Sequence, residues 1–222
     1  MQPIDAIQVT KGMKTICIAS AKGGSGKSTL ATALAVRAGQ EGRVALLDLD
    51  PGTASMTMWL QARGRPDELH LDTGDGLISA RVKALAASGR FDFLLIDTPP
   101  MDVELIQAAI EAADAVIIPV RCGLFDLAAS VVAAEMCREH KRPHAFLLSH
   151  VDGRHPILVE QMIKPLSGMG PIFKTRVKYR KAWITALNLG RSAAEFDRES
   201  RAEVNGLWDE VATLLRKGRL DE

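Results

Sequence analysis

A glycine-rich segment that directly follows a short apolar run constrains the fold of this chain more than any other feature. The run is Thr15–Ser20, and the next residues read Ala-Lys-Gly-Gly-Ser-Gly-Lys-Ser-Thr, from Ala21 to Thr29. Apolar residues then recur between Leu30 and Ala35 at the spacing of a buried helix face. A strand, a glycine-rich turn and a helix in this order can point several backbone N–H groups at phosphate oxygens. We therefore expect a nucleoside triphosphate to bind at this turn.

Each residue type in the turn suits a different part of that ligand. Gly23, Gly24 and Gly26 allow positive φ angles and close approach of the backbone to phosphate. Lys27 would place a positive charge on the β- and γ-phosphates, and the Ser28 hydroxyl would bind Mg²⁺. The N-terminus of the following helix favours negative charge at the same place.

The segment departs from the common phosphate-loop pattern, whose first glycine falls at Ala21, and it carries an additional lysine at Lys22. Lys22–Ser28 resembles the deviant Walker A motif, K-G-G-x-G-K-[ST], of the ParA/MinD family of ATPases, and the chain is most similar to the small ParA-type members without an N-terminal DNA-binding domain. In that family the early lysine contacts the ATP of the partner subunit. The resemblance thus implies ATP and Mg²⁺ as ligands, an ATP-dependent homodimer, and catalytic roles for Lys22 and Lys27. The implied nucleotide-binding residues are Lys22, Gly23, Gly24, Ser25, Gly26, Lys27, Ser28 and Thr29.

Acidic residues close the next apolar run, which ends Leu-Asp-Leu-Asp-Pro at Pro51. The family has D-x-D-P-Q here, which implies that Asp50 helps to position the attacking water or the Mg²⁺ shell. Gly52 stands where the family has glutamine. Taken without the loop upstream, Asp48 and Asp50 would be interpreted as caps of the helix that follows.

A further aspartate, Asp97, ends the apolar run that begins at Phe91, and Pro99 and Pro100 follow it. An acidic residue at the end of a buried strand is the Walker B arrangement, which holds Mg²⁺ directly or through water. The family's h-h-h-h-D-x-P-P matches at these positions. The expected metal-binding residues are therefore Ser28, Asp50 and Asp97.

Two later segments also resemble the family. Ile117–Val120 is similar to its h-h-P-h strand, and Phe146–Arg154 is similar to its h-h-N-x-V-D-x-R segment near the adenine. Ser149 replaces the asparagine of that segment, so adenine contacts could instead come from the backbone around Pro171–Phe173. The histidines, including His150, show no metal-ligand spacing and are expected on the surface or in loops.

Apolar runs alternate with helical patterns along the whole chain, which predicts an α/β fold: a doubly wound, mainly parallel sheet flanked by helices, of the P-loop NTPase type. We expect one domain over residues 1–222, with a short N-terminal arm at 1–12. The expected strands are Thr15–Ala19, Val44–Leu47, Phe91–Ile96, Ala115–Val120, Ala145–Ser149 and Pro171–Phe173. The expected helices are Lys27–Gln40, Ala54–Ala62, Gly76–Ala87, Val103–Ala113, Leu124–Glu139, Pro156–Leu166, Tyr179–Leu189 and Glu199–Lys217.

The composition is that of a cytoplasmic globular protein. An apolar fraction of 47% allows a sizeable core, and three widely separated cysteines suggest buried thiols in a reducing compartment. The N-terminus lacks the basic and apolar regions of a secretory signal. The net charge of +1 means that any nucleic-acid surface must be local.

Such a local surface is predicted near the C-terminus, where five positive charges fall within eight residues. The tail also resembles the family's R-x-x-Y-x-x-A pattern at Arg176, and many ParA-type members bind DNA non-specifically through such elements. The candidate DNA-binding residues are Lys174, Arg176, Lys178, Arg180, Lys181 and Arg201. Interleaved acidic residues keep open the alternative of an ordinary solvated helix face.

The resemblance implies a ParA-like ATPase that positions or segregates a plasmid, a chromosome or a protein complex, and that is nucleoid-associated when it holds ATP. A ParB-like or cargo-adaptor protein would stimulate hydrolysis. Two alternatives remain. One is a MinD-like membrane-cycling ATPase, disfavoured because the apolar stripe between Val204 and Leu215 is expected to pack on the sheet. The other is a metabolic or redox enzyme of the same fold, for which cluster cysteines are lacking.

Overall fold

The fold is built on one six-stranded parallel sheet. The computed structural model describes residues 12–50, 55–72 and 76–220, and the strands lie in the order β3-β2-β4-β1-β5-β6. Every pairing between neighbouring strands is parallel. The strands are β1 (Lys14–Ile18), β2 (Val44–Asp48), β3 (Leu69–Asp72), β4 (Phe93–Asp97), β5 (Ala115–Val120) and β6 (His144–Leu148).

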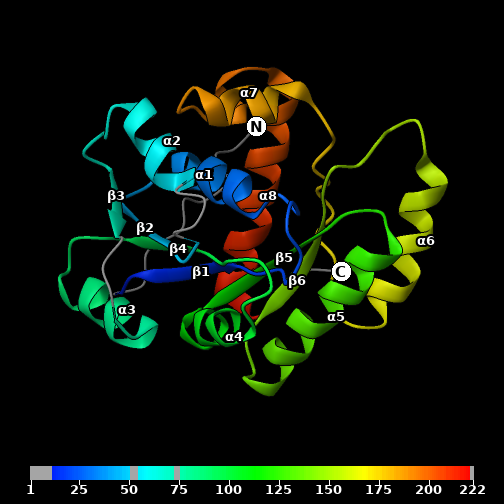
Figure 1. Cartoon of the computed structure of the whole chain (residues 1–222), viewed down its shortest axis with the longest axis horizontal. Coiled ribbons are helices and arrows are strands. Elements are labelled where there is room, and N and C mark those ends of the chain that lie inside the picture. Colours follow the sequence, from blue (N-terminus) through cyan, green and yellow to red (C-terminus); the bar gives the residue numbers. More distant parts are fainter. Residues whose placement is uncertain (1–11, 51–54, 73–75, 221–222) are drawn as a thin grey trace.

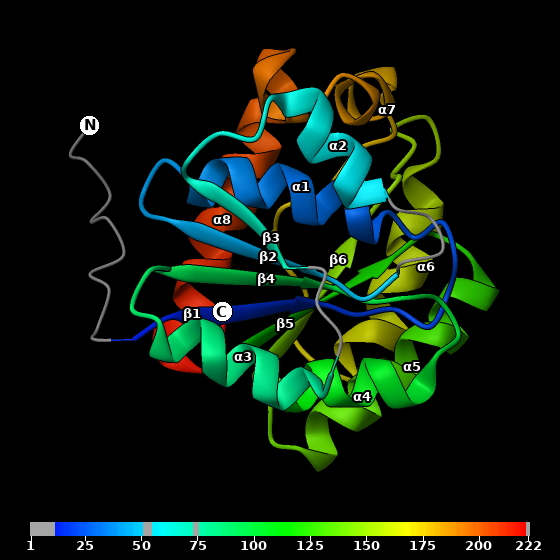
Figure 2. The same cartoon turned by 60° about the vertical axis from the view of Figure 1, so that its left-hand side comes forward.

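Helices cover both faces of this sheet, as the alternation of apolar runs and helical patterns predicts (Figures 1 and 2). One face carries α1 (Lys27–Ala38), α2 (Ser55–Arg63), α7 (Lys181–Asn188) and α8 (Arg198–Lys217). The other carries α3 (Ile78–Ala87), α4 (Val103–Ala112), α5 (Leu124–Glu139) and α6 (Pro156–Ser167). A short 3₁₀ helix, η1 (Ala193–Glu195), precedes α8.

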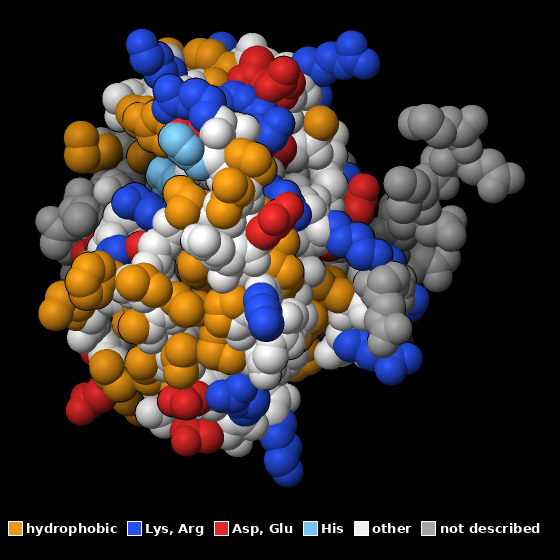
Figure 3. Space-filling view, turned by 90° about the vertical axis from the view of Figure 1, so that its right-hand side faces the viewer, with side chains coloured by type: hydrophobic (Ala, Val, Ile, Leu, Met, Phe, Trp, Pro, Cys, Tyr) orange, Lys and Arg blue, Asp and Glu red, His pale blue; other side chains and the backbone are white. Residues whose placement is uncertain are grey.

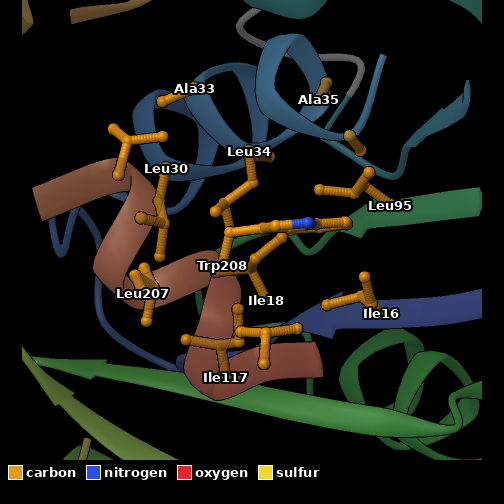
Figure 4. Close-up of a cluster of buried hydrophobic side chains, with 14 of the residues drawn as sticks. Ile16, Ile18, Leu30, Ala33, Leu34, Ala35, Leu95, Ile117, Leu207 and Trp208 are labelled. Carbon is orange, nitrogen blue, oxygen red and sulfur yellow. The ribbon is translucent and has the colours of Figure 1, made fainter. Parts of the chain in front are cut away.

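Alternate residues of the strands divide between the two cores. Ile16 and Ile18 of β1 face α1 and α8, whereas Cys17 between them faces the opposite layer. Figure 4 shows Trp208 of α8 inserted between the sheet and α1, close to Ile18. Its indole Nε1 donates a hydrogen bond of 3.0 Å to Glu41, so this large side chain is buried with its polar atom satisfied. The stripe of α8 thus packs on the sheet, as expected from its spacing.

The sheet differs from the sequence expectation in two places. Leu69–Asp72 forms an unpredicted edge strand, because its side chains alternate between apolar and polar instead of forming a continuous apolar run. Pro171–Phe173, expected as a strand, makes only a single bridge, between Ile172 and Phe146 of β6. A proline at its start has no N–H for a ladder, so the pairing ends there.

The strand order places the glycine-rich loop, which follows β1, near the middle of the sheet's carboxyl edge. The chain moves from β1 to β2 on one side and later from β4 to β5 on the other, so the connections diverge beside β1. Ligands of open α/β sheets bind at such a point. None of the helices in the described ranges is long and apolar enough to cross a bilayer.

Candidate nucleotide-binding site

Two of the three loop glycines adopt the positive φ angles that were expected to be available to them, whereas Gly23 does not. Gly24 has φ +70°, and Gly26, which caps the N-terminus of α1, has φ +93°. The Cα of Gly24 lies under the guanidinium of Arg121, and that of Gly26 lies under the ring of His150. Replacing either glycine by a larger residue would therefore strain the backbone and place the new Cβ atom against a neighbouring side chain.

Lys27 is buried inside the loop. Its Nζ donates a hydrogen bond of 3.1 Å to the carbonyl oxygen of Lys22, and the Ser25 hydroxyl donates to the same oxygen at 3.2 Å. Burial lowers the pKa of Lys27, and the carboxylates of Asp97 and Asp50 oppose that shift. Within the loop this ammonium has a backbone carbonyl as its hydrogen-bond acceptor, which an anion can replace.

Asp97 lies at the end of β4 in register with Asp48 at the end of β2. It is 1% exposed, and burial raises its pKa to about 7, with further increases from Asp48 and Asp50. A hydrogen bond from Ser28 and the charge of Lys27 act in the opposite direction. The carboxyl group thus belongs to a buried polar cluster beside the loop, together with the serine hydroxyl.

These oxygen atoms fit the requirements of Mg²⁺. The Oδ1 atom of Asp97 is buried without a hydrogen-bond partner, and the Ser28 hydroxyl lies next to the same carboxyl group. No three His, Cys, Asp or Glu side chains form a metal-binding group within residues 12–50, 55–72 and 76–220. Mg²⁺ commonly uses one or two carboxylates together with substrate phosphates and water, and the site matches that pattern.

Asp50 is half-buried at the same edge. Its backbone N–H donates a hydrogen bond of 2.9 Å to Asp48, and burial raises the pKa of Asp48. Asp50 therefore lies among the other expected site residues. Gly52, which stands where the family has glutamine, lies outside the described residues.

Lys22 points away from the interior of its own loop. Its Nζ forms an ion pair with Asp126 of α5, with the nearest atoms 2.5 Å apart. The lysine side chain is 35% exposed and the aspartate 9%. The sequence interpretation missed Asp126, whose only local signal is an acidic residue in the first turn of a helix.

An apolar pocket adjoins the side of the loop at Gly26. It is lined by Gly26 and Thr29 of the loop and α1, by Ser149 and His150 after β6, and by residues 177–180 and 183–184. The Ser149 hydroxyl donates a hydrogen bond of 3.3 Å to the Ser25 carbonyl, which joins the pocket to the loop. This position beside the expected phosphate site suits a nucleobase. The lining uses residues 177–180 and not Pro171–Phe173. His150 lies in the loop after β6, as expected, and is half-buried there.

The basic segment runs along the outer edge of β6. Lys174, Arg176, Lys178 and Lys181 are exposed. Arg180 is instead held by Glu199 and Glu203 of α8, at 2.8 and 2.7 Å. Arg201 is exposed and donates a hydrogen bond to the carbonyl of Ala194. Figure 3 shows lysine and arginine side chains gathered near the top of the face that carries α5 and α6. The exposed lysines and Arg176 thus remain the available cations of the segment.

Known proteins share this architecture. A protein named "Maintenance of carboxysome distribution protein A", from Halothiobacillus neapolitanus, is 27% identical over 89% of this chain and 95% of its own. The structure of an ATP complex of McdA from Cyanothece covers 92% of this chain and 97% of its own, at 19% identity and a TM-score of 0.69. MinD from Pyrococcus horikoshii, solved with Mg-ADP, covers 92% and 99% at 17% identity and a TM-score of 0.70.

The family match spans most of the site described above. Residues 16–194 match the family described as the CobQ/CobB/MinD/ParA nucleotide binding domain. The matched range contains the loop, Asp97, Asp126 and the apolar pocket. This chain therefore belongs to the CobQ/CobB/MinD/ParA nucleotide-binding family.

Proposed function

We propose that this protein is a ParA-like ATPase that closes an ATP-sandwich dimer, binds DNA non-specifically in that state and positions a cargo. The observation that carries the proposal is the different placement of its two loop lysines. Lys27 is buried within the loop, whereas the ammonium of Lys22 lies outside it on Asp126, partly exposed. Lys27 would thus bind the phosphates of its own protomer, and Lys22 would leave Asp126 to contact the nucleotide of a second one.

Hydrolysis would depend on positioning and on neutralising charge. The backbone amides of the loop and the ammonium of Lys27 would stabilise negative charge on the phosphates, and Lys22 would add a second ammonium from the partner. Ser28 and Asp97 would hold Mg²⁺, which would neutralise negative charge on the phosphates. Asp50, at the same edge of the sheet, would orient the attacking water.

The cargo is proposed from the relatives. One relative is named for the maintenance of carboxysome distribution and another is named protein ParA. We infer that this chain positions a comparable large object, a protein complex or a plasmid, in the cytoplasm. A ParB-like or cargo-adaptor protein would bind the dimer, stimulate hydrolysis and so release it from DNA.

The DNA surface would be formed by the exposed cations Lys174, Arg176, Lys178 and Lys181. Contacts of lysine and arginine with phosphate need no base sequence, and each contact that neutralises a phosphate releases a counterion. Binding should therefore weaken steeply as salt is raised. The dimer would carry two such surfaces and associate with the nucleoid only while ATP is bound.

Dimer formation is the first test. Light scattering should show a monomer with ADP and a dimer with ATP and Mg²⁺. Lys27→Ala should abolish ATP binding, whereas Lys22→Ala should bind ATP as a monomer but fail to dimerise. A Lys22→Ala protein that dimerises like the wild type would contradict the role of Lys22 across the interface.

DNA binding is the second test. Fluorescence anisotropy with unrelated duplexes should show ATP-dependent binding that falls with salt, and a double Lys174→Ala, Lys181→Ala variant should bind more weakly with a smaller salt slope. Lys164→Ala on α6 serves as the matched charge control. Binding to anionic liposomes without binding to DNA would refute the proposal and favour a membrane-cycling ATPase.

A further inference from the structure

Arg121 places a third cation on the glycine-rich loop. It directly follows β5, which is the neighbour of β1 in the sheet, so its side chain starts from the same edge as the loop. A Cβ atom built on Gly24 would lie 3.1 Å from Nη2 of Arg121 and 3.8 Å from its Cζ. The guanidinium therefore packs directly on the loop backbone at Gly24.

This guanidinium has no anion of its own in the described part of the chain. It makes no ion pair with a described carboxylate, and its Nε is buried without a hydrogen-bond partner. Other arginines of the molecule are paired, for example Arg63 with Glu195 and Arg81 with Asp72. A guanidinium offers five N–H donors, and leaving a buried one unsatisfied costs free energy. An oxyanion at the loop would satisfy it.

The neighbours of Arg121 do not supply the acceptor that its guanidinium lacks. Asp126, whose charge opposes that of Arg121 in its effect on the pKa of His150, is paired with Lys22. His150 covers Gly26, and burial together with the charge of Arg121 lowers the pKa of this histidine. The guanidinium of Arg121 therefore stays without a paired carboxylate among the described residues.

The position along the loop indicates which part of the ligand Arg121 meets. The apolar pocket lies at Gly26 and Thr29, so the base would bind at that end. Gly24 lies toward the other end, which is also the end of Lys22. The phosphates farthest from the base therefore reach the guanidinium.

We propose that Arg121 is a phosphate-binding residue that acts within its own protomer and donates hydrogen bonds to the terminal phosphate of the bound nucleoside triphosphate. The inference rests on the proposed function, because it requires a triphosphate in the loop. It adds a residue that distinguishes ATP from ADP, and it assigns a second purpose to Gly24, which leaves room for the guanidinium.

The test compares nucleotide affinities of Arg121→Ala and Arg121→Lys with the wild type, using ADP and a slowly hydrolysed ATP analogue. A lost charge-assisted hydrogen bond should weaken binding of the analogue about 10- to 100-fold and change ADP binding far less. Lysine should restore part of the affinity, because it supplies the charge without the planar fork. Arg90→Ala, at the opposite edge of the sheet, is the matched control and should bind like the wild type.

The same measurements in a Lys22→Ala background separate action within a protomer from action across a dimer. The loss caused by Arg121→Ala should persist in that background. Analogue binding within about twofold of the wild type, equal losses for the analogue and ADP, or a loss that disappears without Lys22 would each overturn the assignment. A wild-type protein that binds no ATP would instead reject the proposed function, and Lys27→Ala calibrates that outcome.

Discussion

Replacing Asp126 with asparagine is expected to make the ATP-dependent dimer more stable. In the described structure the ammonium of Lys22 is held by Asp126 of the same protomer. This ion pair must break before Lys22 can turn to the phosphates of a partner subunit. Asparagine keeps the shape of the side chain but removes its charge, so the lysine is released at lower cost.

The geometry sets the size of the effect. The two charged atoms are 2.5 Å apart, but the Lys22 side chain is 35% exposed, so solvent screens much of the attraction. Pairs of this kind contribute about 1 kcal/mol or less. A symmetric dimer breaks two of them, and about 2 kcal/mol corresponds to an increase of about 30-fold in the dimerisation constant. We expect an increase between about 5-fold and 30-fold.

Sedimentation equilibrium with ATP and Mg²⁺ measures that constant. Glu135→Gln is the matched control, because it removes the carboxylate partner of Arg138 further along the same helix α5. A variant that combines Asp126→Asn with Lys22→Ala should stay monomeric like Lys22→Ala alone, because the expected increase in dimer stability acts through Lys22. A folded Asp126→Asn protein whose dimer is no tighter than the wild type would refute the reasoning.

Three further predictions concern stability and the loop. Because the pKa of Asp97 is about 7 when folded and 3.8 in the unfolded reference, the native state retains a proton that the unfolded chain releases, and stability falls as pH rises from about 4 to 7. The fall in the free energy of unfolding amounts to up to about 4 kcal/mol, and Asp97→Asn should remove it when unfolding by urea is measured without metal. If the variant and the wild type lose stability equally with pH, the raised pKa of Asp97 is contradicted. Gly24→Ala should cost about 1 kcal/mol of stability or more, because φ is +70° at this position. It should also weaken ATP binding, because the new methyl group would displace Arg121. An ATP affinity that calorimetry finds unchanged would contradict this. Arg180→Ala should destabilise the fold by about 2 kcal/mol by leaving two glutamates of α8 without their partner, and an unchanged melting temperature would show that these ion pairs are not stabilising.

Most strands and helices could be predicted from the sequence because each buried strand is a continuous apolar run flanked by helical spacing. The edge strand Leu69–Asp72 gives a different signal, since only one of its faces is buried and its pattern alternates over four residues. Pro171–Phe173 looks like a strand by composition, yet it makes one bridge to Phe146. Composition describes what a residue prefers, whereas pairing also depends on available N–H groups.

Some residues of the site could likewise be predicted from the sequence, and others could not. Lys27, Ser28 and Asp97 could be predicted because each belongs to a contiguous motif whose residue types suit phosphate or Mg²⁺. Asp126 and Arg121 could not, because they approach the loop only after β5 takes its place beside β1. Lys22 and Asp126 are 104 residues apart in the sequence, and no local pattern encodes their contact.

The stretch at 177–180 has a consequence for how this protein could be engineered. It forms one wall of the pocket beside α1, and Lys178 within it is also one of the exposed cations. A shift of this wall when nucleotide enters would move the basic surface directly, with no relay through the sheet. Substitutions there should change nucleotide affinity and DNA affinity together. Variants that separate the two activities are better sought at Lys174 or Lys181, which lie outside the pocket lining.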